Sequence, residues 1–211
     1  MATLQIASDM PIREFLNALA SVDSPHGAVS ASAVAGAMGT SLLLMVAALP
    51  TTRSDSIDER TALMHAATAL SELQEQLIET IETETAVKLF AARNLPQANV
   101  TQRAKREAAI QFALRAAADV PLEVIRLCGL GLKQAQTVAA SSCRAAGSEV
   151  ELAVTLLRVG FTGARSNLEA RLSSLTDLVY TKAVIEEIAY LGEEATIAAR
   201  AAELSVQAPP A

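Results

Sequence analysis

Alanine dominates this chain and restricts it to a helical fold. The 211 residues include 43 Ala but only 9 Gly and 7 Pro. Ala has the highest helix propensity of the natural residues, whereas Gly and Pro have the lowest. We therefore predict an all-α protein. The chain shows no change of composition that would mark a domain boundary, so we expect residues 1–211 to form a single domain of long, mostly antiparallel helices, with residues 205–211 as a flexible tail.

The same composition predicts self-association. Hydrophobic residues make up 51% of the chain and aromatic residues only 3%, so most of the apolar side chains are small. Small side chains bury little area per residue, and a single subunit of this size would have a thin core. We therefore expect a homodimer or a higher homo-oligomer.

Charge and residue counts exclude several functional classes. The chain has a net charge of -6, and its Lys and Arg residues are dispersed. A protein that binds nucleic acid or an anionic membrane would instead have its basic residues clustered. Two Cys and two His residues fit no familiar disulfide framework or zinc motif, so we predict no bound metal. The first eight residues lack the features of a signal peptide, which indicates a cytoplasmic protein.

One uncharged segment, Ala31–Leu49, is long enough to resemble a membrane span. Its small residues argue against that interpretation. Ser32, Gly36, Gly39 and Thr40 lower its hydrophobicity, and their spacing allows another helix backbone to come close. We predict a helix that is buried on all sides within a bundle.

Cap, breaker and periodicity signals divide the rest of the chain. Pro11 opens a first helix, and Ser148 with Glu151 has the spacing of a capping box. Pro121 is expected to kink or interrupt a helix. The predicted helices cover residues 12–20, 55–93, 101–120, 122–142, 148–172 and 175–204. The second of them carries an apolar seam at Leu63, Ala67, Leu70, Leu73, Leu77 and Ile81.

Two groups of polar residues are candidates for a site. Gly27 and Ser30 lie where free N–H groups at the start of the uncharged helix would anchor a polar ligand, although on spacing alone a turn with an N-cap serine is the ordinary explanation. Glu75, Glu79 and Glu82 share one helix face and repel one another unless a cation lies opposite, although a solvated face is the ordinary explanation.

The residue order from Phe15 to Val46 resembles a known family. Its pattern, G-x-x-S-A-x-A-x-A-G-A-M-G-x-x-L-x-x-M-V, is similar to the N-terminal signature of the formiminotetrahydrofolate cyclodeaminase and methenyltetrahydrofolate cyclohydrolase family. Matching segments follow at Leu95-Pro96-Gln97, Ala117–Leu122, Ser148-Glu149 and Asn167, so the resemblance covers residues 11–190. It implies an all-α homodimer that binds a tetrahydrofolate derivative near the subunit interface.

The chain departs from the family pattern at several positions. Where the family has Pro-Gly-Gly-Gly-Ser, this chain has His26-Gly27-Ala28-Val29-Ser30, so two of three glycines are lost. Glu82 and Glu149 stand at positions where the family has Asp, Ala86 replaces a Phe, and Arg171 replaces the second Asn of an Asn-x-x-x-Asn motif. Each change from Asp to Glu moves a carboxylate outward by one methylene.

The resemblance implies catalytic roles for two residues. Methenyltetrahydrofolate is a resonance-stabilised cation that must add water and then open to 10-formyltetrahydrofolate. A carboxylate can favour the cation and take a proton from water, and we assign that role to Glu82. Arg53 is expected to bind the carboxylate tail of the folate or to pair with Glu82.

The resemblance also implies the substrate-binding residues. Gly27 and Ser30 would anchor the pterin with His26 beside them, and Glu149 and Asn167 would line the pocket. The expected function is that of a methenyltetrahydrofolate cyclohydrolase, with the folate as substrate and no cofactor. Two alternatives remain open, a formiminotetrahydrofolate cyclodeaminase and a divergent paralogue that serves as a non-catalytic binding or scaffold subunit.

Overall fold

A computed structural model describes residues 10–22, 27–49, 56–81, 91–142 and 144–207. Within these ranges the regular structure is entirely helical, which confirms the predicted all-α class. The elements are α1 (Ile12–Ala20), α2 (Ala28–Ala48), α3 (Ile57–Ile81), α5 (Val100–Ser141), the 3-10 helix η2 (Arg144–Ala146), α6 (Gly147–Leu172) and α7 (Leu178–Gln207).

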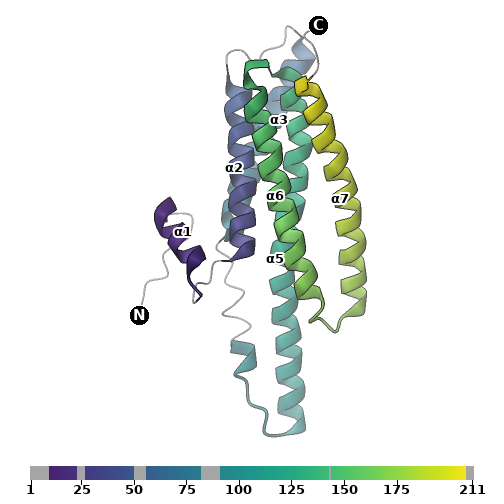
Figure 1. Ribbon diagram of the computed structural model, residues 1–211. Coiled ribbons are helices and arrows are strands. Elements are labelled where there is room, and N and C mark those ends of the chain that lie inside the picture. The colour runs from purple at the N-terminus through teal and green to yellow at the C-terminus, as the bar shows by residue number, and fades with distance from the viewer. Residues whose placement is uncertain (1–9, 23–26, 50–55, 82–90, 143, 208–211) are drawn as a thin grey trace.

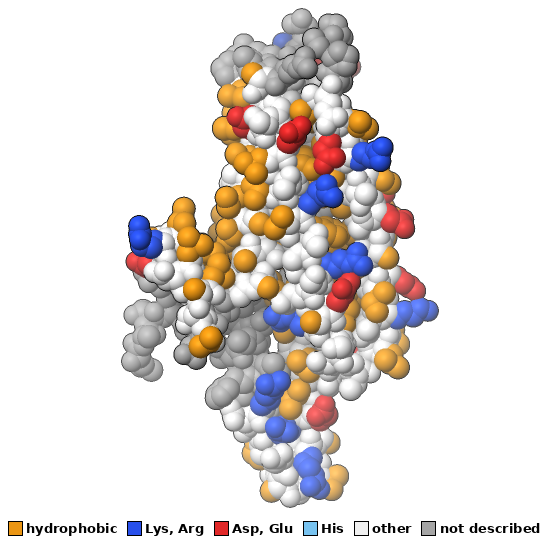
Figure 2. All heavy atoms as spheres, in the orientation of Figure 1, with side chains coloured by type: hydrophobic (Ala, Val, Ile, Leu, Met, Phe, Trp, Pro, Cys, Tyr) orange, Lys and Arg blue, Asp and Glu red, His pale blue; other side chains and the backbone are white. Residues whose placement is uncertain are grey.

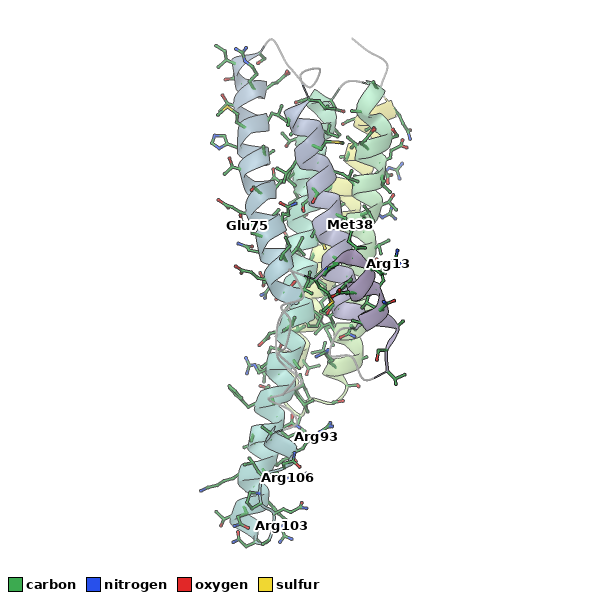
Figure 3. All side chains as sticks on the ribbon, turned by 90° about the vertical axis from the view of Figure 1, so that its left-hand side faces the viewer. Arg13, Met38, Glu75, Arg93, Arg103 and Arg106 are labelled. Carbon is green, nitrogen blue, oxygen red and sulfur yellow. The ribbon has the colours of Figure 1, made fainter. Side chains whose placement is uncertain are left out.

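The long helices α2, α3, α5, α6 and α7 run along one bundle axis (Figure 1). Helix α2 packs against α3, α5 and α6, and α7 packs mainly on α5. The N-terminal part of α5 projects beyond the ends of α6 and α7 (Figure 1). The backbone carbonyl of Arg93 accepts a hydrogen bond from Arg106 Nε on this projection, at 2.9 Å. Arg93, Arg103 and Arg106 make the tip of the molecule basic (Figure 3).

Helices α2 and α6 approach each other so closely that their contact requires glycine. A Cβ added to Gly160 of α6 would lie 2.7 Å from the Ser32 carbonyl oxygen and 3.1 Å from the Gly36 nitrogen, both in α2. A Cβ on Gly39 would lie 2.8 Å from the Ala153 carbonyl oxygen. Side chains at these positions would force the two backbones apart. The prediction that small residues let another helix come close to this segment is therefore confirmed.

The expectation that this helix is buried on all sides is wrong. Thr40, Leu43 and Val46 are fully buried, but Met38 is 53% exposed and Met45 is 43% exposed. Helix α2 is apolar enough to cross a membrane, with a mean hydropathy of 1.7 over its most apolar 18 residues, yet 44% of that stretch is buried in the bundle. Helix α2 carries no charged residue, and among the described residues the side chains of Met38 and Met45 on its outer face are left largely uncovered. Figure 3 looks onto this face, with Met38 on α2 and Glu75 on the neighbouring α3.

A second expectation, an interruption of the helix at Pro121, is wrong for α5. Pro121 lies inside it and is buried, but the helix continues through the proline as one element of 42 residues. Its N-cap residue is Asn99, whose side chain accepts a hydrogen bond from the Gln102 nitrogen. A third expectation, a capping box at the start of α6, is also wrong. The N-cap residue of α6 is Ala146, and no side chain caps the helix.

The expected seam of α3 is confirmed at Leu70, Leu73, Leu77 and Ile81, all of which are buried.

The glycines of α5 and α6 provide a matched pair of substitutions that test this packing. Gly160→Ala should lower the free energy of unfolding by about 1–3 kcal/mol, because its Cβ meets backbone atoms of α2. At Gly129 of α5 a Cβ would find only Phe161, at an ordinary contact distance of 3.8 Å. Gly129→Ala should therefore raise stability by about 0.5–1 kcal/mol through helix propensity. Urea unfolding measures both, and equal effects of the two substitutions would contradict the packing account.

Candidate functional site

The first predicted site residues lie at the N-terminus of α2. Gly27 is the N-cap residue, in an extended conformation and without a side-chain cap. Its carbonyl accepts the first helical hydrogen bond, from the Ala31 nitrogen at 3.0 Å. Ser30 lies inside the first turn and is only 8% exposed, so the alternative interpretation of Ser30 as the N-cap is wrong. The N–H groups of residues 28–30 precede the first helical hydrogen bond and therefore have no partner within α2.

Asn167 lies at the same end of the bundle. Helices α2 and α6 are antiparallel, because Gly39 packs beside Ala153 whereas Ser32 packs beside Gly163. Asn167 is one turn beyond Gly163 on the same face of α6. This register places Asn167 level with the first turn of α2, close to Gly27 and Ser30. The structure thus brings together three of the predicted residues.

Arg171, which the sequence analysis did not select as a site residue, lies one turn beyond Asn167. Its Nε donates to Asn167 Oδ1 at 2.6 Å, and its Nη1 donates to the Ala117 carbonyl oxygen in α5 at 2.8 Å. In a regular helix that carbonyl would accept from the nitrogen of residue 121, but Pro121 has no N–H. Arg171 therefore supplies the hydrogen bond that the proline removes.

The charge of Arg171 has no carboxylate beside it in the described part of the chain. Burial lowers the pKa of its guanidinium from the ordinary value, because desolvation disfavours the charged form. Arg126, in contrast, makes two hydrogen bonds to Glu187, at 2.6 and 3.0 Å, and these raise its pKa. Within the described residues, Arg171 donates only to neutral acceptors.

Glu149 lies far from this group within one chain. It is in the first turn of α6, and its carboxylate accepts a hydrogen bond from Ser148 Oγ at 2.8 Å. The 18 residues from Glu149 to Asn167 correspond to about 27 Å along a helix. Leu49, which caps the C-terminal end of α2, is at the same end of the bundle as Glu149. The predicted site residues thus divide between the two ends of the bundle.

His26, Arg53 and Glu82 lie outside the described residues. Ile81, which precedes Glu82, is buried at the end of α3. Leu77, one turn earlier, packs against Gly36 in the N-terminal half of α2, so α3 ends near the Ser30 end of the bundle. Glu75 and Glu79 are exposed, which agrees with a solvated face for these two carboxylates.

A cleft and a buried cysteine lie outside this group of residues. The cleft has a volume of about 800 Å³ and lies between α6 and α7, where it is lined by Phe161, Arg165 and Gly192 among others. None of the predicted site residues that the structure describes lines this cleft.

Cys128 is fully buried beside Gly36 and Gly160. Burial raises the pKa of its thiol to about 12, so it is not a nucleophile at neutral pH. Among the residues with described coordinates, no group of three or more His, Cys, Asp or Glu side chains is placed to hold a metal ion.

Comparison with known proteins agrees with this architecture. A methenyltetrahydrofolate cyclohydrolase from Methylorubrum extorquens is 29% identical over 192 residues, which span 90% of this chain and 92% of that protein. A formimidoyltransferase-cyclodeaminase from Sus scrofa is 29% identical over 193 residues, 88% of this chain but only 35% of that longer protein.

The fold is also shared with a solved structure. The formiminotetrahydrofolate cyclodeaminase from Thermotoga maritima superposes with a TM-score of 0.82 at 20% sequence identity, covering 94% of this chain and 96% of that one. The family model for formiminotransferase-cyclodeaminase matches residues 11–190. The chain therefore belongs to the formiminotransferase-cyclodeaminase family.

Proposed function

We propose that this protein is a methenyltetrahydrofolate cyclohydrolase, which hydrolyses 5,10-methenyltetrahydrofolate to 10-formyltetrahydrofolate. The observation that carries the proposal is the relative from Methylorubrum extorquens, which bears that name and matches this chain across nearly the whole length of both proteins. The arrangement of Gly27, Ser30 and Asn167 at one end of the bundle is consistent with it. Available N–H groups, a hydroxyl and an amide are groups that can hydrogen-bond the polar edge of a pterin.

The reaction requires a negative charge near the one-carbon bridge of the substrate. The methenyl group carries a positive charge, and a carboxylate nearby stabilises it and accepts a proton from the attacking water. Glu82 is assigned this role. It follows Ile81, which lies near the Ser30 end of the bundle. The reaction consumes only water, so the mechanism uses the folate as substrate and no cofactor.

The two groups of site residues also support a homodimer. The outer face of α2 carries Met38 and Met45 without a charge, and Figure 2 shows apolar side chains along this side of the bundle. A patch of this kind is covered in most proteins by a partner. An antiparallel two-fold dimer through α2 would bring the Glu149 end of one subunit toward the Ser30 end of its partner. Two composite sites would result.

A cyclodeaminase is the second candidate function. The solved structure with the same fold and the relative from Sus scrofa both bear cyclodeaminase names. That reaction expels ammonia from a formimino group by means of similar acid–base residues. Release of ammonia from formiminotetrahydrofolate, faster than hydrolysis of the methenyl substrate, would favour this candidate. If neither reaction is accelerated, the non-catalytic paralogue becomes the better description.

Loss of the methenyl chromophore measures the proposed activity directly. The purified protein should accelerate the decay above spontaneous hydrolysis near neutral pH, and Glu82→Gln should lower kcat by about 10²–10⁴-fold because it removes the base. Glu79→Gln, an exposed carboxylate one turn earlier, is the matched control and should leave kcat unchanged. Acceleration that survives Glu82→Gln would contradict the assignment of the base but not the activity.

Sedimentation tests the proposed subunit contact. Met38→Glu places a charge on the uncharged face of α2 and should convert the dimer to a monomer near 22.0 kDa with loss of activity, because a buried unpaired charge is costly. Ile197→Glu on α7, at a side chain that is 66% exposed, should leave the dimer intact. A wild-type protein that sediments as a stable monomer would refute the dimer.

Mixing two defective variants tests whether the sites are composite. Ser30→Ala and Glu149→Ala should each be inactive, because each disables one half of every site. After the two are mixed and the subunits exchange, half of the dimers contain both variants and one of their two sites is intact. About a quarter of the wild-type activity should return, as expected for random exchange in a two-fold dimer. No recovery, despite exchange shown by mass spectrometry, would mean that each site lies within one chain.

A further inference from the structure

The hydrogen bond between Arg171 and Asn167 fixes which end of the Asn167 amide can face a ligand. Nε of Arg171 donates to Asn167 Oδ1 at 2.6 Å. A guanidinium has N–H donors and no acceptor, so only the oxygen of an amide can face it. The oxygen of Asn167 is therefore used within α6. The amide nitrogen Nδ2, with its two N–H bonds, is the end that this contact leaves for a ligand.

Arg171 is itself held from outside α6. Its Nη1 donates to the Ala117 carbonyl oxygen of α5 at 2.8 Å, the carbonyl that Pro121 cannot serve. One side chain thus spans two acceptors on two helices. Because a guanidinium is planar and rigid, a hydrogen bond at one nitrogen also fixes the direction of the others. The contact with Ala117 therefore keeps Nε directed at Asn167.

A side chain that also accepts hydrogen bonds would not fix the amide in this way. The family pattern has a second Asn at position 171, and an Asn or Gln can either donate to Asn167 or accept from it. With such a neighbour the Asn167 amide can turn over and present its oxygen instead of its nitrogen. A side chain that only donates, such as Arg or Lys, excludes that second arrangement. Arg171 thus restricts Asn167 to the role of a donor.

The neighbouring backbone groups at this end of the bundle are also donors. Asn167 lies two turns beyond Gly160 on the face of α6 that packs against α2, which places it level with the first turn of α2. The N–H groups of residues 28–30 have no partner within α2. A ligand that binds at this end is therefore recognised through its acceptors. The pterin ring of a tetrahydrofolate carries one carbonyl oxygen, at C4, which is such an acceptor.

We propose that Arg171 is a positioning residue, which orients the Asn167 amide so that its nitrogen donates to the carbonyl oxygen of the pterin ring. This inference rests on the proposed function and extends it to the recognition of one atom of the substrate. Arg171 does not touch the folate and takes no part in proton transfer. It acts through the selectivity of Asn167, whereas Glu82 acts on the rate of the chemical step.

Two ligands that differ at this carbonyl test the orientation. Tetrahydrofolate has the oxygen at C4, whereas its 4-amino analogue has an NH₂ group in that place. Titration calorimetry measures both dissociation constants without any reaction. Wild type should bind tetrahydrofolate about 10- to 100-fold more tightly than the analogue, because the donor of Asn167 would face another donor in the analogue complex. The other differences between the two ligands are the same for every variant, so changes in this preference report on the site.

Substitutions of Arg171 should change the preference according to their donors and acceptors. Arg171→Gln, which can accept as well as donate, should lower the preference about 10-fold, and Asn167→Ala should lower it to the same extent. Arg171→Lys, which only donates, should retain most of it. Arg165→Gln removes an exposed arginine paired with Glu169 and is the control that should leave the preference unchanged. A general loss of structure would weaken both ligands together and would not change their ratio.

A second background separates the positioning role from folding. Pro121→Ala restores an N–H that can satisfy the Ala117 carbonyl, so Arg171→Gln should destabilise the protein less in this background than in wild type. The loss of preference caused by Arg171→Gln should persist there, because Gln still accepts as well as donates. If Pro121→Ala instead abolishes that loss, Arg171 acts only through the fold and the inference is overturned.

The outcomes distinguish this inference from the proposed function. Equal binding of both ligands by wild type, or full preference retained in Arg171→Gln, overturns the inference and leaves the cyclohydrolase intact. The same holds if Arg171→Lys loses the preference as fully as Arg171→Gln does. The expected preference without any hydrolysis of the methenyl substrate overturns the proposed activity alone. A wild-type protein that binds neither ligand overturns the proposed function, and this inference with it.

Discussion

The close contact between α2 and α6 determines where everything else in this protein lies. Gly160 faces the backbone of Ser32 and Gly36 at distances that admit no Cβ, so the two helices can pack in only one register. A shift of one turn would place a side chain at the point of closest approach. This register brings Asn167 level with the first turn of α2. The candidate site is thus a consequence of helix packing, although its residues are far apart in the sequence.

Pro121 has a related effect on α5. A proline inside a helix removes one hydrogen bond and leaves a carbonyl without its donor. In this protein the carbonyl of Ala117 is turned toward α6, where Arg171 donates to it, and the helix continues. The compensation comes from another element, which explains why local signals, which predicted a kink or an interruption, did not show that the helix would continue. It also fixes a guanidinium at the end of the bundle where Gly27 and Ser30 lie.

Sequence patterns predicted the parts of the fold that depend on local composition. The small residues of α2 predicted a close helix contact, and the spacing of Leu70, Leu73 and Leu77 predicted the buried face of α3. Features that depend on a distant partner were missed. The glycines of α6 that meet α2 were not singled out, although Gly160 and Gly163 share a helix face as Gly36 and Gly39 do. The spacing of Ser148 and Glu151 fits a capping box, but α6 begins one residue earlier, at Gly147, and Ser148 bonds to Glu149 instead.

For the candidate site, too, the sequence predicted which residues take part but not how far apart they lie. The family pattern pointed to Ser30, Glu149 and Asn167, but it carried no information on their separation. In one chain, Glu149 and Asn167 are held apart by the length of α6, because a straight helix cannot bring its ends together. A pocket that used both would need two subunits, and the uncharged outer face of α2 lies between the two groups of residues. In the proposed dimer, one contact would account both for the exposure of Met38 and Met45 in a single chain and for the division of the site, since the contact that covers the apolar face would also join the two halves of the site.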